Sequence, residues 1–454
     1  MGSLPLDASL RPLDPEAFSG ESRAVVNFLA EYYCDVEKYP SPGFFAYYPF
    51  NASAAGFAGE MLSVGLNVVP FVWAASPAAA ELETIVVDWM GKLIGLPQRL
   101  LFSGGGGGVL QGSTCEAVVC TLAAARDRAL AKLGHENIMK LVVYASDQTH
   151  VTIQKGARLV GIPPSNFRVI QTSASSGYGL TADAIRAAVD RHVANGLVPL
   201  YLCATVGTTG LGAVDPVREL GEEAQRHGMW LHVDAAYAGS AAICPEFEGY
   251  LDGAELADSH EAMNPHKWFL TNMDCCCLWV ASPATFTAAL STDPEYLKNV
   301  GTNSTGKPAA IDYKDWQISL TRRFRAIKLW VVLRRYGAIG LRGYIHRHVA
   351  AAKRFERMVA EDERFEVVVP RKFLLVCFRL RERIAGDDTV DDLNRELLAA
   401  VNSSGRAFIT HFVVDGKFVI RLAVAGAMTE MQHVMDAWAL LQGKAEEVLR
   451  RHQL

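Results

Sequence analysis

Short apolar runs alternate with helical patterns through the middle of the chain. Apolar runs of strand length end in small or polar residues at 141–145, 167–171, 200–206 and 230–233. Between them, residues 181–195 and 217–226 space their apolar side chains at helical intervals. This alternation is typical of βαβ units, so the pattern predicts an α/β fold with a mostly parallel sheet and helices on both faces.

The flanking patterns predict smaller units. Residues 14–38 carry apolar side chains at helical spacing with acids between them, which indicates an amphipathic helix that packs on a partner surface. A helical pattern at 324–336 precedes alternating runs near 365–380 and 407–424 and a helix after Thr429, which together indicate an α+β unit. We therefore expect an N-terminal helical segment, a large α/β domain and a small C-terminal α+β domain. Their expected bounds are 1–52, 53–324 and 325–454.

The composition narrows the class of partner. Half of the 454 residues are hydrophobic, enough for a sizeable core, and 44 basic and 49 acidic residues leave a net charge of −5. This near-balance lacks the basic surface that nucleic acid or an anionic membrane requires, so small molecules are the expected partners. Nine cysteines, three of them consecutive at 275–277, indicate a reducing compartment, and no zinc-ligand spacing predicts a metal. We find no signal-peptide core and no run of 18 apolar residues, and we expect a cytoplasmic protein.

One acid and one lysine stand at the ends of two apolar runs. The run 230–233 stops at Asp234, which places this carboxylate at the carboxyl end of a buried strand, where α/β sheets bind ligands. Lys267 lies just before another apolar run, where a lysine is costly unless it is neutralised, paired or covalently used. The same residues are also typical of a turn or helix cap and of surface charge. One cofactor uses both groups: pyridoxal phosphate (PLP) needs a lysine for its aldehyde and an acid for its pyridinium nitrogen.

The sequences that surround Asp234 and Lys267 are more specific than the two residues alone. HVDAAYAGS at 232–240 and NPHKWFLTNMDC at 264–275 resemble the group II PLP-dependent decarboxylases, and most closely the plant aromatic L-amino acid decarboxylases. The resemblance runs from about Leu13 to the C-terminus. It implies the aspartate aminotransferase fold (fold type I), PLP as cofactor, and a homodimer with active sites at the interface. It also implies that Lys267 bonds the PLP aldehyde and that Asp234 holds the ring nitrogen.

A second segment is suited to the cofactor phosphate. Residues 112–115 precede an alanine-rich helical pattern from Glu116 to about Leu133, so their N–H groups and hydroxyls lie at a helix N-terminus that favours a phosphate dianion. The glycines at 104–108 are also compatible with a flexible hinge. The family resemblance implies that the PLP phosphate binds here. The residues implied to hold it are Thr114, Cys115, Asn264 and His266.

The family resemblance implies cofactor-binding roles for three further residues. SDQTH at 146–150 matches the motif whose histidine stacks on the PLP ring, which implies this role for His150. TVGTT at 205–209 places Thr209 beside the ring, and Ala236 lies in the same cofactor-binding motif as Asp234. A lone histidine after a strand is otherwise more often a structural hydrogen-bonding group.

An aromatic segment resembles the family's substrate pocket. FAYYPF at 45–50 and the residues up to 76 are also compatible with plain core. By resemblance, Tyr47, Tyr48 and Pro49 line the pocket, and Val69 and Phe71 reach it from the neighbouring subunit. In plant relatives the position of Thr321 separates indole from phenol preference, and its hydroxyl favours a phenolic ring.

One loop matches the family pattern, and two other positions differ from it. DPEYLK at 293–298 matches a lid, on which Tyr296 delivers a proton to the substrate α-carbon in the neighbouring subunit's site. Relatives usually carry a small hydroxyl residue where this chain has Phe50. EKYP at 37–40 runs directly into SPGFFAYYP, where relatives carry a further helical stretch, so dimer-clasp material is missing.

The resemblance implies decarboxylation of tyrosine or dihydroxyphenylalanine, with tryptophan or phenylalanine as further substrates. An aromatic aldehyde synthase is an alternative, which the presence of both Tyr296 and His150 disfavours. A non-catalytic paralogue with a shortened dimer clasp is another.

Overall fold

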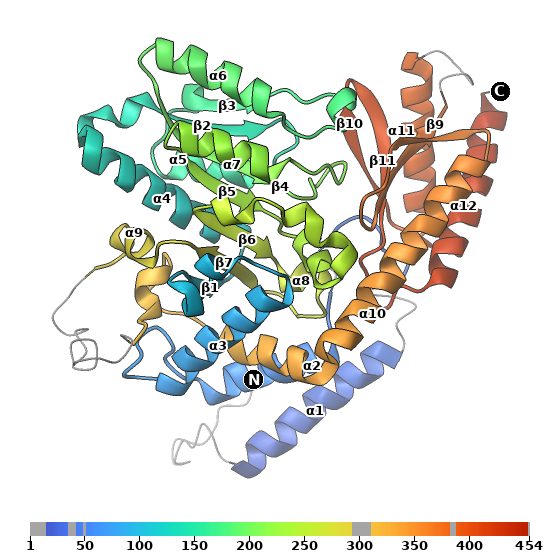
Figure 1. Cartoon of the computed structure of the whole chain (residues 1–454). Coiled ribbons are helices and arrows are strands. Elements are labelled where there is room, and N and C mark those ends of the chain that lie inside the picture. Colours follow the sequence, from blue (N-terminus) through green and yellow to red (C-terminus); the bar gives the residue numbers. More distant parts are fainter. Residues whose placement is uncertain (1–14, 35–41, 49–50, 293–309, 382–386, 453–454) are drawn as a thin grey trace, which may run out of the picture.

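The chain folds into two sheet-containing parts and one projecting helix (Figure 1). In this computed structural model the described residues are 15–34, 42–48, 51–292, 310–381 and 387–452. The strands are β1 (Gly107–Gln111), β2 (Leu141–Ser146), β3 (Phe167–Ile170), β4 (Val198–Thr205), β5 (Trp230–Asp234), β6 (Ser259–Met263), β7 (Cys276–Val280), β8 (Phe365–Val369), β9 (Leu375–Leu380), β10 (Thr410–Val414) and β11 (Lys417–Ala423). The helices are α1 (Pro15–Cys34), α2 (Ala54–Leu66), α3 (Pro77–Leu93), α4 (Thr114–Leu133), α5 (Thr152–Leu159), α6 (Ala182–Ala194), α7 (Val217–Arg226), α8 (Pro265–Trp268), α9 (Pro283–Ala288), α10 (Arg325–Glu361), α11 (Asp387–Ser403) and α12 (Met431–Arg451).

The larger sheet has the order β1-β7-β6-β5-β4-β2-β3. Within it, β7 is antiparallel to β1 and β6, and the other described pairings are parallel. This confirms the predicted mostly parallel sheet. Each strand and helix expected between residues 141 and 234 is present with ends within two residues of the prediction.

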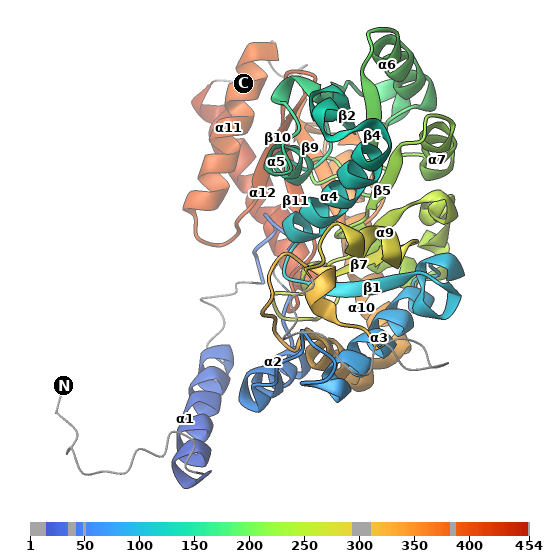
Figure 2. The same ribbon diagram turned by 90° about the vertical axis from the view of Figure 1, so that its left-hand side faces the viewer.

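Both faces of the large sheet are buried. Along β2, Val142 and Tyr144 join a core with residues of α3, α6 and α7, whereas Leu141 and Val143 join a second core with residues of α4. Figure 2 shows α4 and α5 on one side of the strands and α6 and α7 on the other. Because helices cover both faces, β2, β4 and β5 are largely apolar, whereas β6 carries buried polar residues.

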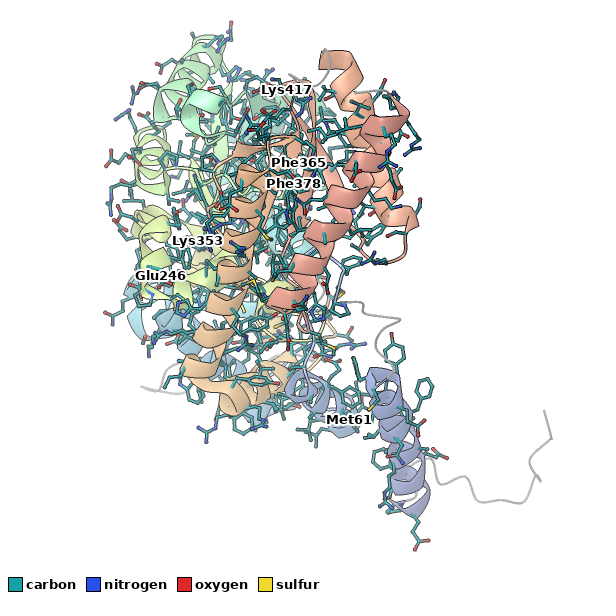
Figure 3. All side chains as sticks on the ribbon, turned by 90° about the vertical axis from the view of Figure 1, so that its right-hand side faces the viewer. Met61, Glu246, Lys353, Phe365, Phe378 and Lys417 are labelled. Carbon is teal, nitrogen blue, oxygen red and sulfur yellow. The ribbon has the colours of Figure 1, made fainter. Side chains whose placement is uncertain are left out.

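The smaller sheet, β10-β11-β9-β8, is antiparallel and packs against α11, α12 and the second half of α10. Figure 3 places Phe365 and Phe378 together in this core, and their ring centroids are 6.1 Å apart. The predicted helix 324–336 ends where Gly337 adopts φ 59°, and the chain then continues as helix to Glu361. The first half of α10 packs on the large core, and the boundary between 324 and 325 stays a prediction.

Helix α1 confirms the predicted N-terminal helix and projects away from the body (Figure 2). Its exposed apolar side chains include Phe18, Val25, Val26, Phe28, Tyr32 and Tyr33. Among the described helices, none is both long and apolar enough to cross a bilayer. The nine cysteines all lie in described segments, and none forms a disulfide.

Candidate active site

Four segments that are distant in sequence end at one edge of the large sheet. Asp234 is the last residue of β5, His150 follows β2, Thr209 follows β4, and Lys267 follows β6. Since β2, β4, β5 and β6 are successive parallel strands, their carboxyl ends meet at the same edge. This is the edge at which open α/β sheets bind ligands.

The Asp234 carboxylate is buried and fixed by backbone groups. Only 4 % of the residue is exposed, and its Oδ1 accepts a hydrogen bond from Ala236 N at 3.0 Å. The Ala236 carbonyl in turn accepts from Asn264 N at 2.7 Å, which ties the end of β5 to the turn that carries the lysine. The acid is therefore held in one orientation.

Lys267 lies half-buried in the single turn α8. Its backbone N donates to Asn264 O at 2.8 Å, and its carbonyl accepts from Asn51 Nδ2 at 2.9 Å. The Asn264 amide satisfies both of its ends when its oxygen accepts from Lys267 Nζ at 3.1 Å and its nitrogen donates to Glu261 Oε1 at 3.0 Å. The amine is thus positioned by a neutral side chain and has no covalent or ionic partner among these contacts.

His150 belongs to the same electrostatic neighbourhood. Its Nδ1 lies 2.6 Å from Thr152 Oγ1 and accepts from Thr152 N at 3.3 Å. The pKa of His150 is lowered because the protein displaces water from the imidazolium; Asp234 opposes this shift and Lys267 adds to it. The ring is therefore uncharged at neutral pH, which suits a face that stacks on an aromatic cofactor.

Helix α4 begins at this edge as predicted. Ser113 caps it by accepting from Glu116 N at 3.4 Å. The Thr114 hydroxyl donates to Glu261 Oε1 at 2.6 Å, and Cys115 Sγ lies 3.5 Å from Thr152 Oγ1. The first turn of the helix therefore faces the same group of side chains as Lys267.

His266 is braced by the backbone of the following segment. Its Nδ1 accepts from Cys275 N at 3.0 Å, and burial, together with Lys267, lowers the pKa of His266 to about 4. The imidazole is therefore neutral and holds the turn between α8 and β7.

Two stacked aromatic rings lie beside the turn after β4. The ring of Tyr48 stacks on Tyr237 with centroids 4.0 Å apart and an interplanar angle of 8°, and its hydroxyl donates to Thr209 O at 3.4 Å. Arg421 from β11 donates through Nε to Gly210 O at 2.9 Å. Gly207 permits this packing because its φ is 83° and a Cβ there would lie 2.4 Å from the Ala238 Cβ.

The structure thus gathers only part of the predicted set. Asp234, Ala236, Asn264, Lys267, His150 and Thr114 form one group, and Tyr48 and Thr209 form a second group with Arg421. Tyr47, Val69 and Thr321 are exposed, and Phe71 is half-buried. Pro49, Phe50 and Tyr296 lie outside the described residues. The roles given to all of these residues remain predictions.

Sequence reasoning missed Glu261, Tyr237 and Arg421. The available signal for Glu261 was a charged residue inside a short buried strand next to the strand of Asp234. Arg421 is a buried charge inside the alternating run 407–424. Tyr237 lies within the motif that carries Asp234, but nothing in its spacing indicates stacking on Tyr48.

The donor set fits PLP. Lys267 offers a primary amine for an aldehyde, Asp234 a buried carboxylate for a cationic ring nitrogen, His150 an uncharged ring, and α4 the N-terminus of a helix. Glu261, which accepts from Thr114, is an additional acid beside the first turn of α4.

Comparisons with known proteins agree with this chemistry. Residues 10–381 match the pyridoxal-dependent decarboxylase conserved domain. Tyrosine decarboxylase 1 of Narcissus pseudonarcissus is 50% identical over 493 aligned positions, which cover 98% of this chain and 95% of the relative. The crystal structure of Rhodiola rosea 4-hydroxyphenylacetaldehyde synthase has a TM-score of 0.91 at 45% identity, and that of Oryza sativa TDC with PLP and tryptamine has 0.93 at 41%. Each of these two alignments covers 97% of this chain and 100% of the other.

Proposed function

The chain belongs to the pyridoxal-dependent decarboxylase family, as a PLP-dependent carboxy-lyase of the kind that acts on aromatic amino acids, and from this premise we propose its substrate and its active-site residues. The proposed reaction converts L-tyrosine or L-dihydroxyphenylalanine to the arylalkylamine and CO₂, in the cytoplasm. L-Tryptophan and L-phenylalanine are secondary substrates. The observation that carries the proposal is the meeting of Lys267, Asp234 and His150 at the carboxyl edge of one parallel sheet.

The proposed division of work follows from the contacts. When bound, PLP supplies an aldehyde and a cationic ring that withdraws electrons from the substrate's α-carbon. Lys267 provides the amine that holds this group, and Asp234, fixed by Ala236 N, keeps the proton on the ring nitrogen. His150 covers one face and orients the substrate carboxylate. Tyr296 returns a proton to the α-carbon and, with the lid, excludes water.

The substrate preference is tested with a panel of four amino acids. Because Thr321 places a hydroxyl at the position that separates indole from phenol preference in plant relatives, we expect tyramine and dopamine to form faster than tryptamine and phenethylamine. Purified protein is incubated with each L-amino acid, and the amines are quantified by chromatography. A kcat/KM that is highest for tryptophan would reverse the proposed preference.

An aldehyde synthase is the nearest chemical alternative, since a relative of that activity is among the similar structures. The two activities differ in their products. A decarboxylase releases one amine for each CO₂, whereas an aldehyde synthase consumes oxygen and releases aldehyde, ammonia and peroxide. We expect the amine, because the chain carries both Tyr296 and His150.

We further propose a homodimer, in which Val69 and Phe71 reach the partner's pocket. The apolar side chains of α1 support this, and so does the apolar groove that α1 forms with the start of α2, lined by Val26, Leu29 and Phe57 among others. The alignment with the tyrosine decarboxylase spans 493 positions against 454 residues here, so the relative carries residues that this chain lacks. A non-catalytic paralogue would instead be monomeric and would take up no PLP.

Charges on α1 are expected to weaken the dimer. Val25 and Phe28 are 57% and 65% exposed and lie one helical turn apart. Burying two such side chains contributes roughly 3–6 kcal/mol to dimer stability. The dimer dissociation constant of the double variant V25E/F28E is therefore expected to be at least about a hundredfold higher than that of the unmodified protein. Sedimentation velocity over a concentration series measures this. Asn27→Glu, which adds a charge at a polar position of the same helix, is the control, and equal dimer stability in all three proteins would contradict a role for α1.

A further inference from the structure

Glu261 is a buried acid beside the acid assigned to the cofactor ring. In the register of β5 and β6, Asp234 pairs with Glu261, so the two side chains leave the sheet on the same face. Glu261 is fully buried, and the pairing of β6 with β7 shifts register between His260 and Met263, a bulge that re-aims the side chains within it. Two carboxyl groups therefore share one water-poor site.

Polar side chains from α4, from β7 and from the turn after β6 lie next to Glu261. On α4, the Thr114 hydroxyl donates to Oε1 at 2.6 Å, and after β6 the Asn264 amide donates to the same oxygen at 3.0 Å while it accepts from Lys267 Nζ. Cys276 on β7 presents a thiol. Oε2 is buried and accepts from no nitrogen or oxygen donor within the described part of the chain, so the weakly donating Cys276 thiol is the group left to it. A buried carboxylate oxygen left with only a weak thiol donor is poorly stabilised, which favours the protonated carboxyl.

Burial raises the pKa of Glu261 to about 8, and the neighbouring Asp234 adds to the rise, while Lys267, Thr114 and Cys276 oppose it. The carboxyl is therefore neutral below about pH 8 and ionised above it.

We propose that Glu261 makes cofactor binding proton-linked: its neutral carboxyl accompanies bound PLP, and its ionised carboxylate opposes PLP. This inference rests on the proposed function, which puts the PLP phosphate at the first turn of α4. There the Thr114 hydroxyl proton already points at Glu261, so an ionised Glu261 competes with the phosphate for the same donor and repels it. A neutral Glu261 keeps a proton of its own to donate and imposes no charge. PLP binding therefore favours the protonated form.

The test compares PLP affinity in the full-length protein and in Glu261→Gln, a neutral variant of the same shape. PLP is titrated into each apoprotein between pH 6.5 and 9.5, and the absorbance of the lysine-bound cofactor gives Kd. Titration of PLP itself is common to both proteins and cancels in the ratio of the two values. The ratio of unmodified to E261Q Kd is expected to be near one at pH 6.5 and to rise through pH 8 to about tenfold, the factor for a one-unit pKa shift of one carboxyl on binding.

A second neutral variant and a matched acid complete the design. Glu261→Ser, which needs less space, is expected to give the same pH-dependent ratio. Glu116→Gln removes an exposed acid from the same turn of α4, and its ratio is expected to be the same at every pH. Calorimetry at pH 8 in buffers of different ionisation enthalpy adds a direct readout, because the unmodified protein is expected to take up more protons on binding PLP than E261Q. A ratio that is flat with pH overturns this inference alone, whereas failure of every protein to bind PLP overturns the proposed function.

Discussion

Replacing Lys267 by alanine is expected to lower kcat/KM for CO₂ release from L-tyrosine roughly 10⁴-fold, as loss of a covalent catalytic group does in other enzymes. The reason is local, because Lys267 Nζ is the amine that Asn264 positions at 3.1 Å beside the buried Asp234. The measurement is CO₂ release under single-turnover conditions. The absorbance of lysine-bound PLP is expected to disappear from the variant while free PLP added to it remains spectroscopically unchanged.

Lys267→Arg is the control that separates charge from chemistry. Arginine keeps the positive charge near Asp234 and Glu261 but stays protonated and forms no stable bond to an aldehyde. We therefore expect K267R to be as inactive as K267A, with thermal unfolding showing that both variants are folded. CO₂ release by K267A within tenfold of the unmodified rate would contradict the assignment of this lysine.

The strands β2, β4 and β5 of the large sheet could be predicted because both of their faces are buried. Burial on both faces makes β2, β4 and β5 largely apolar runs, and Asp234 lies at the end of one of them. The helix 324–336 shows the limit of local pattern. Gly337 ends it as expected, yet the helix resumes, because Leu341, Tyr344 and Ile345 still face the core. That continuation is decided by packing and not by the local sequence.

The candidate site was only half predictable for a different reason. Asp234 and Lys267 could be identified because they lie at the ends of apolar runs. By contrast, Glu261 contacts Thr114, 147 residues away in the sequence, and Arg421 contacts Tyr48, 373 residues away. Such contacts depend on which strands pair and in which register. The pairing of Asp234 with Glu261 in particular requires β6 to follow β5 in the sheet with the observed alignment. Spacing along one chain contains no information on that alignment.

The second large effect is expected from Asp234→Asn. The amide oxygen can still accept from Ala236 N, so the local backbone is retained, but the negative charge opposite the ring nitrogen is lost. An opposite charge about 4 Å away contributes about 4 kcal/mol at an effective dielectric constant of 20. Because this charge matters most when electrons move into the ring, kcat is expected to fall about a thousandfold. The measurement is amine formation at saturating L-tyrosine, with PLP occupancy checked by absorbance.

Asp88→Asn is the matched control for the loss of a buried carboxylate. Asp88 is 9% exposed on α3 and accepts from Phe102 N at 2.8 Å and Ser103 N at 3.2 Å, so its replacement by an amide loses one acceptor. We expect D88N to lose about 1 kcal/mol in the free energy of unfolding and so to unfold at a lower temperature. Its kcat is expected to stay within about twofold of the unmodified value. If D234N instead behaves like D88N, losing stability but not turnover, the Asp234 carboxylate braces the end of β5 and the ring nitrogen is held by another group. A loss of turnover in D234N at full PLP occupancy and unchanged unfolding temperature is the outcome that only an electrostatic role produces.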